Sequence, residues 1–222
     1  MGDWIQLKAA DGFELAAWRA APAGLPKGGV VVIQEIFGVN HHIRSVTDRF
    51  AAEGYLAVAP AVFDRVEPKV ELGYDPEGVQ QGMGIAGKVD RDKAMLDVAA
   101  AIGEAASAGK VGIVGFCMGG TFAWVASARS PGLAAAVGYY GGGVVAAKAL
   151  QPQVPTMLHF GEKDDHIPLA GVKEVGELHP DVPIYLYPAG HGFHCDERAS
   201  YEAASAKLAW KRTLAFFAQH LG

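Results

Sequence analysis

Short apolar runs alternate with segments of helical periodicity along the whole chain, and this alternation most constrains its fold. Eight runs have the length and the β-branched or aromatic content of strands. They cover residues 5–8, 14–19, 29–33, 55–58, 110–114, 134–139, 156–160 and 184–187. The later runs are continuously apolar, which is typical of parallel strands covered on both faces.

Helical patterns lie between most of these strands. They cover residues 42–53, 90–107, 118–128, a stretch that starts near Leu169, and residues 198–219. The alternation predicts an α/β fold with a mostly parallel central sheet, helices on both faces, and an antiparallel edge formed by the hairpin 5–19. We expect a single domain, residues 1–222, with its ligand site at the carboxyl ends of the strands.

Composition and charge exclude several classes of protein. Half of the 222 residues are hydrophobic, and 19 Lys and Arg against 24 Asp and Glu give a net charge of −5. Without a basic cluster, neither nucleic acid nor an anionic membrane is expected as a partner, which leaves small molecules. No export signal or bilayer-spanning run is visible, so we expect a cytoplasmic monomer or small homo-oligomer with free thiols at Cys117 and Cys195.

Residues 60–89 have the least regular pattern, because Pro68, Pro76 and five glycines interrupt them. An excursion of this length in a compact domain is usually functional, and it predicts a loop or small lid over the edge of the sheet. Its Gly82-x-Gly84-x-x-Gly87 pattern matches a dinucleotide fingerprint but follows no strand. We therefore predict no cofactor there.

A candidate nucleophile, Cys117, lies in the segment GFCMGG at residues 115–120, directly after the apolar strand. The pattern G-x-C-x-G at a strand-to-helix turn is typical of a nucleophile elbow, whose sharp turn requires small residues on both sides. The helix N-terminus would favour a thiolate, and the amide of Met118 would point at a developing oxyanion. The alternative is a buried cysteine followed by an ordinary loop.

Candidate partners for Cys117 follow two later strands in the order nucleophile, acid, histidine. His191 lies between glycines after the last strand, where it would act as general base or form a thiolate–imidazolium pair. Asp164 follows the preceding strand and would orient the His191 ring. Asp165 is the alternative acid, but the spacing of Asp164 from its flanking Gly and Pro favours Asp164.

Other histidines and cysteines offer a competing interpretation. His191, His194 and Cys195 resemble soft metal ligands, but no Cys-x-x-Cys pair completes a structural zinc site, so no metal is expected. The pair His41-His42 predicts a solvated helix start.

Four aromatic side chains are candidates for the core or for the lining of a pocket. Trp124 and Trp210 lie at helical positions and are predicted to be core residues. Tyr139 and Tyr140 end a strand before three glycines, where they would either line a pocket or pack in the core.

Four segments together resemble the dienelactone hydrolase family, the carboxymethylenebutenolidases. They are QEIFGVN at 34–40, GFCMGG at 115–120, GYYG at 138–141 and GHGF at 190–193. The resemblance covers nearly the whole chain and implies a minimal α/β-hydrolase fold without a cofactor. It implies a triad of Cys117, His191 and Asp164 that hydrolyses an enol lactone through an acyl-enzyme, in the degradation of aromatic compounds.

The resemblance also implies roles for side chains outside the triad. Glu35 would lie beside the thiol and help to convert it to thiolate when substrate arrives, and the amides of Ile36 and Met118 would form the oxyanion hole. Four further side chains are predicted to bind the substrate: Phe37, Tyr140, Phe193 and Arg198. A thioesterase or general carboxylesterase with the same triad, and a non-catalytic binding protein on a hydrolase scaffold, are the alternatives.

The sequence departs from the family in its arginines. In the family, one arginine in the segment that matches residues 75–81 and another four residues after the catalytic histidine hold the substrate carboxylate. Here residues 75–81 contain no arginine, and Cys195 stands at the second position. Thiol or amide groups do not replace a bidentate guanidinium. Arg198 and Lys88 are the cations that could reach the site, and the departure leaves the substrate open while ester or lactone hydrolysis is still expected.

Overall fold

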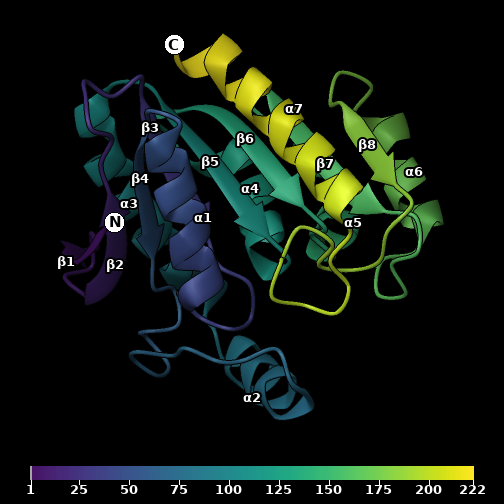
Figure 1. The fold of residues 1–222 in the computed structure, drawn as a ribbon, viewed down its shortest axis with the longest axis horizontal. Helices are drawn as coiled ribbons and strands as arrows, with labels where there is room; N and C mark the ends of the chain where they lie inside the picture. Colours follow the sequence, from purple (N-terminus) through teal and green to yellow (C-terminus); the bar gives the residue numbers. More distant parts are fainter. Residues whose placement is uncertain (1) are drawn as a thin grey trace.

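An eight-stranded sheet with the strand order β1-β2-β4-β3-β5-β6-β7-β8 forms the centre of the protein (Figure 1). The structure is a computed structural model, and it describes residues 2–222. The strands are β1 (Asp3–Lys8), β2 (Glu14–Ala20), β3 (Gly29–Ile33), β4 (Leu56–Pro60), β5 (Val111–Phe116), β6 (Leu133–Tyr139), β7 (Thr156–Gly161) and β8 (Ile184–Tyr187). The pairs β1–β2 and β2–β4 are antiparallel and all others are parallel, which confirms the predicted sheet and its antiparallel edge.

Helices cover both faces of this sheet, as predicted (Figure 1). They are α1 (His41–Ala52), α2 (Pro76–Ala86), α3 (Arg91–Ala105), α4 (Met118–Arg129), α5 (Gly143–Ala146), α6 (Leu169–Leu178) and α7 (Ala203–Leu221), with a short 3₁₀ turn, η1 (Ala106–Ala108). Within residues 2–222, no helix combines the length and the hydropathy needed to cross a bilayer.

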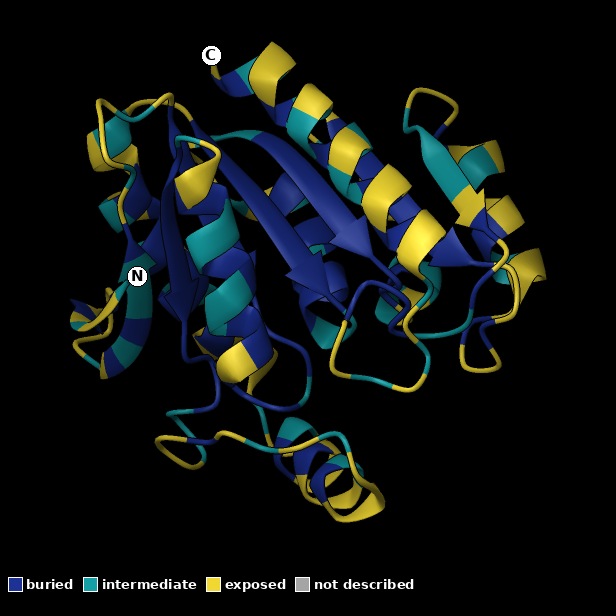
Figure 2. Cartoon of the chain, in the orientation of Figure 1, coloured by how far each residue is buried: buried dark blue, intermediate teal, exposed yellow. Residues whose placement is uncertain are grey.

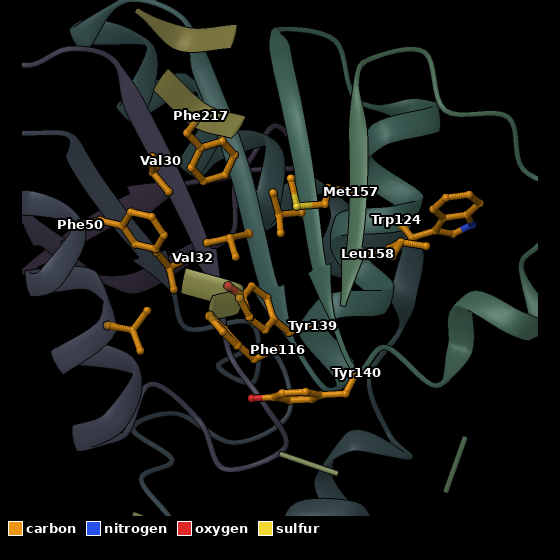
Figure 3. Packing of buried hydrophobic residues seen from close by; sticks show 14 of the residues in the cluster. Val30, Val32, Phe50, Phe116, Trp124, Tyr139, Tyr140, Met157, Leu158 and Phe217 are labelled. Carbon is orange, nitrogen blue, oxygen red and sulfur yellow. The ribbon is translucent and has the colours of Figure 1, made fainter. Parts of the chain in front are cut away.

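Alternate side chains of the central strands enter two different cores. On one side, Val30 of β3 packs in a cluster with Phe50 of α1 and Phe217 of α7, whose rings are 6.0 Å apart (Figure 3). On the other side, Val31 packs in a cluster with Val98 of α3. Strands β3, β4, β5 and β7 are buried along their whole length, and β6 is buried from Ala135 onward (Figure 2), as expected of parallel strands covered on both faces.

The C-terminal helix starts later than its periodicity predicts. The prediction of a helix over residues 198–219 was wrong at its beginning, because α7 starts at Ala203. The side chain of Glu202 accepts hydrogen bonds from the amides of Ala204 and Ser205 and so caps the helix. The preceding residues form turns, in which the amide of Tyr201 donates to the carbonyl of Arg198. Arg198 therefore lies in the turns before α7 and not in the helix.

The irregular segment 60–89 contains the helix α2, which the sequence did not predict because glycines interrupt its pattern. Asp75 caps α2 through the amide of Gly78, and a proline occupies its first turn. Gly82 faces the carbonyl oxygen of Ile36, which a Cβ atom would approach to 2.3 Å. Gly82 therefore lets α2 pack closely against Ile36, beyond the carboxyl ends of β5 and β6 (Figure 1), whereas Gly84 has open space around it.

Two predictions about aromatic and imidazole side chains have different outcomes. Trp124 is fully buried, as predicted, whereas Trp210 is half-buried against Phe50 at a ring distance of 4.5 Å. The expectation of a solvated His41-His42 pair was wrong for His42. Only His41 is exposed, and His42 is fully buried because it lies on the inner face of α1.

Candidate active site

The predicted elbow has an unusual backbone conformation. Cys117 lies between β5 and α4 with φ 54° and ψ −116°, a region that non-glycine residues rarely adopt. A Cβ atom at Gly115 would lie 1.9 Å from the carbonyl oxygen of Gly119, and one at Gly119 would lie 2.3 Å from that of Ile33. Only glycine fits both positions, and the turn holds the half-buried thiol at the N-terminus of α4.

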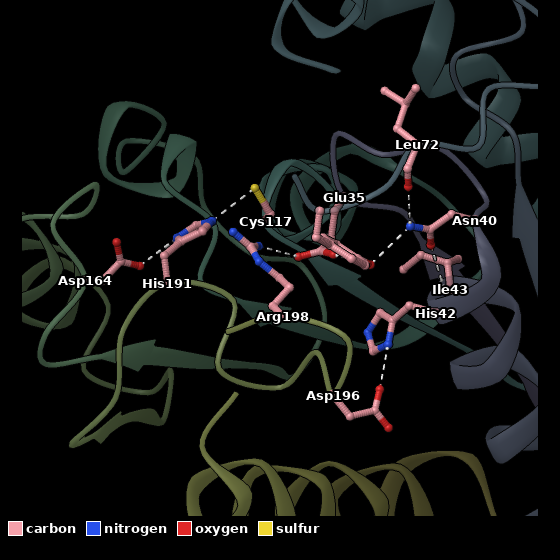
Figure 4. Close-up of polar contacts among 11 residues, drawn as sticks. Glu35, Asn40, His42, Ile43, Leu72, Cys117, Asp164, His191, Asp196 and Arg198 are labelled. Carbon is pink, nitrogen blue, oxygen red and sulfur yellow. Dashed lines mark hydrogen bonds and ion pairs between the residues drawn. The ribbon is translucent and has the colours of Figure 1, made fainter. Parts of the chain in front are cut away.

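Cys117, His191 and Asp164 form a continuous chain of contacts (Figure 4). The Sγ atom of Cys117 lies 3.2 Å from Nε2 of His191, and Nδ1 of His191 lies 2.7 Å from Oδ2 of Asp164. The Asp164 side chain is fully buried, and its Oδ1 accepts a hydrogen bond from the amide of His166. Asp165 is exposed, so Asp164 is the carboxylate that contacts His191.

The surroundings of His191 favour its charged form. Burial lowers the pKa of His191, but the hydrogen bonds to Asp164 and Cys117, together with their charges, outweigh burial and raise this pKa to about 10. An imidazolium at neutral pH beside Sγ is the state expected of a thiolate–imidazolium pair. Of the two roles predicted for His191, the geometry and charge favour the ion pair.

Replacing Asp164 with asparagine is expected to lower the pKa of His191 and to reduce kcat/KM by up to about 10⁴-fold. If the imidazolium donates a proton to the leaving group, kcat/KM should fall as pH rises through the pKa of His191. We expect this limb near pH 10 in the native protein and at lower pH in Asp164→Asn. Profiles of kcat/KM across the neutral and alkaline range measure the shift.

The exposed neighbour Asp165 supplies the matched control, because Asp165→Asn should keep the native profile. Stability gives a second readout. A His191 pKa raised from 6.5 to about 10 adds stability that is complete below pH 6.5 and is lost as pH rises towards 10. Asp164→Asn should reduce this pH dependence of the unfolding midpoint. An alkaline limb that stays in place in the variant would contradict the proposed contact.

Glu35 follows β3 and is fully buried, and its carboxylate faces Arg198 (Figure 4). Its Oε1 lies 3.2 Å from Nη1 of Arg198, and its Oε2 accepts a hydrogen bond of 3.1 Å from the hydroxyl of Tyr74. The guanidinium of Arg198 also lies 5.6 Å from the ring centroids of Phe37 and Tyr74. Burial lowers the pKa of Arg198, but Glu35, first among several neighbouring groups, outweighs burial, so this pKa is raised.

Tyr74 is a site neighbour that sequence reasoning missed, because it lies in the segment interpreted as a loop. It holds Glu35 and in turn receives a 3.2 Å hydrogen bond from Asn40, the residue that caps α1. No motif marks such a tyrosine. Only its hydrogen bond to Glu35, which is distant in the sequence, makes it part of the site.

Glu35, His42 and Cys195 each present one potential metal ligand atom, and these atoms lie within 4.8 Å of one another. Burial raises the pKa of Cys195 to about 12, so its sulfur is a protonated thiol at neutral pH and a poor ligand. Glu35 is also occupied by Arg198 and Tyr74. We therefore interpret the group as a buried polar network and assign no metal to it.

A cavity of about 790 Å³ opens beside Cys117 and His191. Ile36 and Met118, whose amides are the predicted oxyanion donors, both line it next to the thiol. Cys117, His191, Ile36 and Met118 therefore border one space. This combination is suited to acyl transfer.

The four predicted substrate-binding side chains fall into two groups. Phe37 and Arg198 line the cavity, whereas Lys88, the other cation considered, is exposed and outside its lining. Tyr140 and Phe193 are fully buried and also outside the lining, with their rings 5.5 Å apart. Tyr140 packs 5.2 Å from the ring of His191, so of the alternatives for this tyrosine, core packing is the observed one.

Comparisons with known proteins agree along nearly the whole chain. The sequence profile described as "Dienelactone hydrolase family" matches residues 15–221. A "Putative carboxymethylenebutenolidase" of Synechocystis sp. is 35% identical, covering 94% of this chain and 93% of the relative. Another protein of that name, from Azospirillum brasilense, is 37% identical and covers 98% and 99%.

A solved structure shows the same similarity in three dimensions. The crystal structure of "Putative Dienelactone Hydrolase" from Klebsiella pneumoniae matches with a TM-score of 0.87 at 33% identity, covering 99% of both chains. The strand order, the elbow and the sequence matches lead to one assignment. This chain belongs to the dienelactone hydrolase family, within the α/β hydrolases.

Proposed function

We propose that the protein hydrolyses small esters or lactones with Cys117 as its nucleophile. The observation that carries this proposal is the contact chain from Sγ of Cys117 through His191 to the buried Asp164, at 3.2 and 2.7 Å, beside the cavity. The names of the relatives support a lactone or ester as substrate. A reducing compartment keeps thiols such as Cys117 and Cys195 free, and we propose the cytoplasm.

The reaction would proceed through an acyl-enzyme. The thiolate of Cys117 attacks the acyl carbon, and the amides of Ile36 and Met118 stabilise the resulting oxyanion. When this intermediate collapses, the bond between carbon and the leaving oxygen breaks, and His191 gives that oxygen its proton. His191 then takes a proton from water, which attacks the thioester and releases the acid and the thiolate.

Glu35 would support this chemistry by holding Arg198. The carboxylate is fully buried and ion-paired with a guanidinium that is itself largely buried, and Arg198 borders the same cavity as Cys117. The positive charge of Arg198 lies close enough to favour a thiolate or a bound oxyanion. Because Glu35 and Tyr74 fix its position, we infer that loss of Glu35 misplaces this charge.

Replacement of Glu35 with glutamine is expected to lower kcat/KM on the order of 100-fold through misplacement of Arg198. It should also reduce the free energy of unfolding by about 3 kcal/mol, since Arg198 remains buried without its anion. Urea unfolding and steady-state kinetics measure the two effects. Glu71→Gln, which removes the exposed partner of Arg44, should cost no more than about 1 kcal/mol and preserve activity. Equal behaviour of the two variants would refute a special role for Glu35.

A substrate panel tests the proposed function directly. We expect purified protein to hydrolyse p-nitrophenyl acetate and at least one lactone, without added metal or cofactor. The panel should pair carboxylated with neutral lactones and include an acetyl thioester. A strong preference for dienelactone would support the role in aromatic-compound degradation that the resemblance implies, whereas failure to hydrolyse any member would contradict the proposal.

A further inference from the structure

The cavity at Cys117 is much longer than attack on an ester carbonyl requires. Along α4 its lining residues recur every three or four positions, from Met118 through Phe122 and Val125 to Arg129. These residues lie on one face of the helix, and the eleven-residue separation corresponds to ~16 Å at 1.5 Å per residue. The cavity therefore extends from the thiol along the whole length of α4.

The helix α2 provides another wall of this space. Val79, Met83 and Ala86 of α2 line the cavity, at spacings of four and three residues that place them on one helical face. Gly82, the neighbour of Met83, packs against the carbonyl of Ile36, so the wall is seated directly on the loop that carries a predicted oxyanion donor. The middle of the cavity thus lies between uncharged side chains of α2 and α4.

The side chain of Met83 is apolar, yet most of it is exposed to solvent. Its exposed fraction is 64%, although it points into a cavity that Val125 and Leu150 also line. A thioether side chain adapts to irregular apolar ligands, and apolar surface grouped around a concavity marks a binding site for apolar groups. A hydrocarbon placed between these side chains would bury them.

Few charged residues line the cavity, and Arg91 and Asp92 among them are exposed neighbours of opposite charge at the start of α3. At the thiol end Arg198 is neutralised by Glu35, and Arg129, the last residue of α4, is exposed at the opposite end. Between α2 and α4 a carboxylate would lose water and meet no cation on either helix short of Arg129. The chemistry of the middle section therefore selects an uncharged chain.

The chemistry of the elbow decides which part of an ester occupies this space. The leaving oxygen must lie near Nε2 of His191, which protonates it, so the acyl substituent points away from the imidazole. We propose that the protein acts on esters whose acyl group is an elongated, uncharged hydrocarbon lying between α2 and α4. This inference rests on the proposed hydrolase function of Cys117 and specifies its substrate class.

Two matched ester series test the proposal. We expect kcat/KM to rise at least ten-fold from p-nitrophenyl acetate to the hexanoate or octanoate, since each buried methylene adds binding energy. A ten-fold rise corresponds to about 1.4 kcal/mol. Acetate esters of ethanol, butanol and hexanol should show no comparable rise. A flat acyl series, or a rise confined to the alcohol series, would overturn the assignment.

Substitutions on α2 test where the acyl chain binds. Met83→Glu places a charge in the apolar section and should reduce the octanoate-to-acetate ratio of kcat/KM at least ten-fold. Gln81→Glu makes the same change of charge at an exposed position of α2 outside the cavity lining, and it should keep the native ratio. An unchanged ratio in Met83→Glu would contradict the placement of the chain beside α2.

The proposed hydrolase function and the proposed binding of the acyl chain between α2 and α4, here called the acyl channel, can be refuted separately. Hydrolysis of acetate without a preference for longer acyl groups would leave the function intact and refute the channel. If no ester is hydrolysed, the function fails, and binding still tests the channel. We then expect octanoate, but not acetate, to raise the melting temperature of the native protein, and Met83→Glu to remove this shift. No shift with octanoate would refute the channel as well.

Discussion

Cys117→Ala is expected to abolish ester hydrolysis, lowering kcat/KM by about 10⁴-fold, while the protein stays folded. In the proposed mechanism the thiol is the group that bonds to the acyl carbon, so His191 and Asp164 cannot form an acyl-enzyme without it. Alanine keeps the Cβ atom in the same strained turn, so the loss should be catalytic. Steady-state assays on p-nitrophenyl acetate, with circular dichroism as a check on folding, measure it.

The other cysteine supplies the control for this substitution. Cys195 is fully buried and does not line the cavity, and burial raises its pKa to about 12. Cys195→Ala should therefore retain hydrolysis, apart from a modest loss of stability. The account would be overturned if Cys117→Ala kept full activity, or if Cys195→Ala lost activity to the same extent.

Gly115→Ala is expected to have the largest effect on folding. Its Cβ atom would lie 1.9 Å from the carbonyl oxygen of Gly119, and neither the strand nor the helix can retreat, because both are buried. We expect the free energy of unfolding to fall by about 3 kcal/mol or more, or the protein to be insoluble. Urea denaturation followed by tryptophan fluorescence measures the change.

Gly103→Ala is the matched control for Gly115→Ala. Gly103 lies in α3 with open space around a Cβ atom, so alanine there should stabilise the protein by about 0.5–1 kcal/mol. A native-like unfolding midpoint for Gly115→Ala would show that the elbow tolerates a side chain. It would remove the physical reason for glycine on both sides of the nucleophile.

Local sequence contained most of the information on the sheet and the elbow. The run at residues 29–33 is apolar at every position because both faces of β3 are buried, and its spacing from the following helix fixes a parallel crossover. The elbow was recognisable because backbone contact at Gly115 and Gly119 excludes every other residue type. Both features depend on near neighbours along the chain.

Features that depend on contacts between distant segments were less predictable. The glycines of α2 suggest a loop until the carbonyl of Ile36, far away in sequence, explains Gly82. His42 looks like a solvated residue until its position facing Glu35 and Cys195 is known. Tyr140 and Phe193 are adjacent to the site in sequence, yet their rings pack into the core behind it.

The central claim, covalent catalysis by Cys117, is tested most directly by trapping the acyl-enzyme. Native protein mixed with excess p-nitrophenyl acetate and quenched in acid within one turnover should gain the mass of one acetyl group. Peptide mapping should place that group on Cys117, and Cys117→Ala should show none. An active enzyme without an adduct, or an adduct that maps to Cys195 or another residue, would contradict the account.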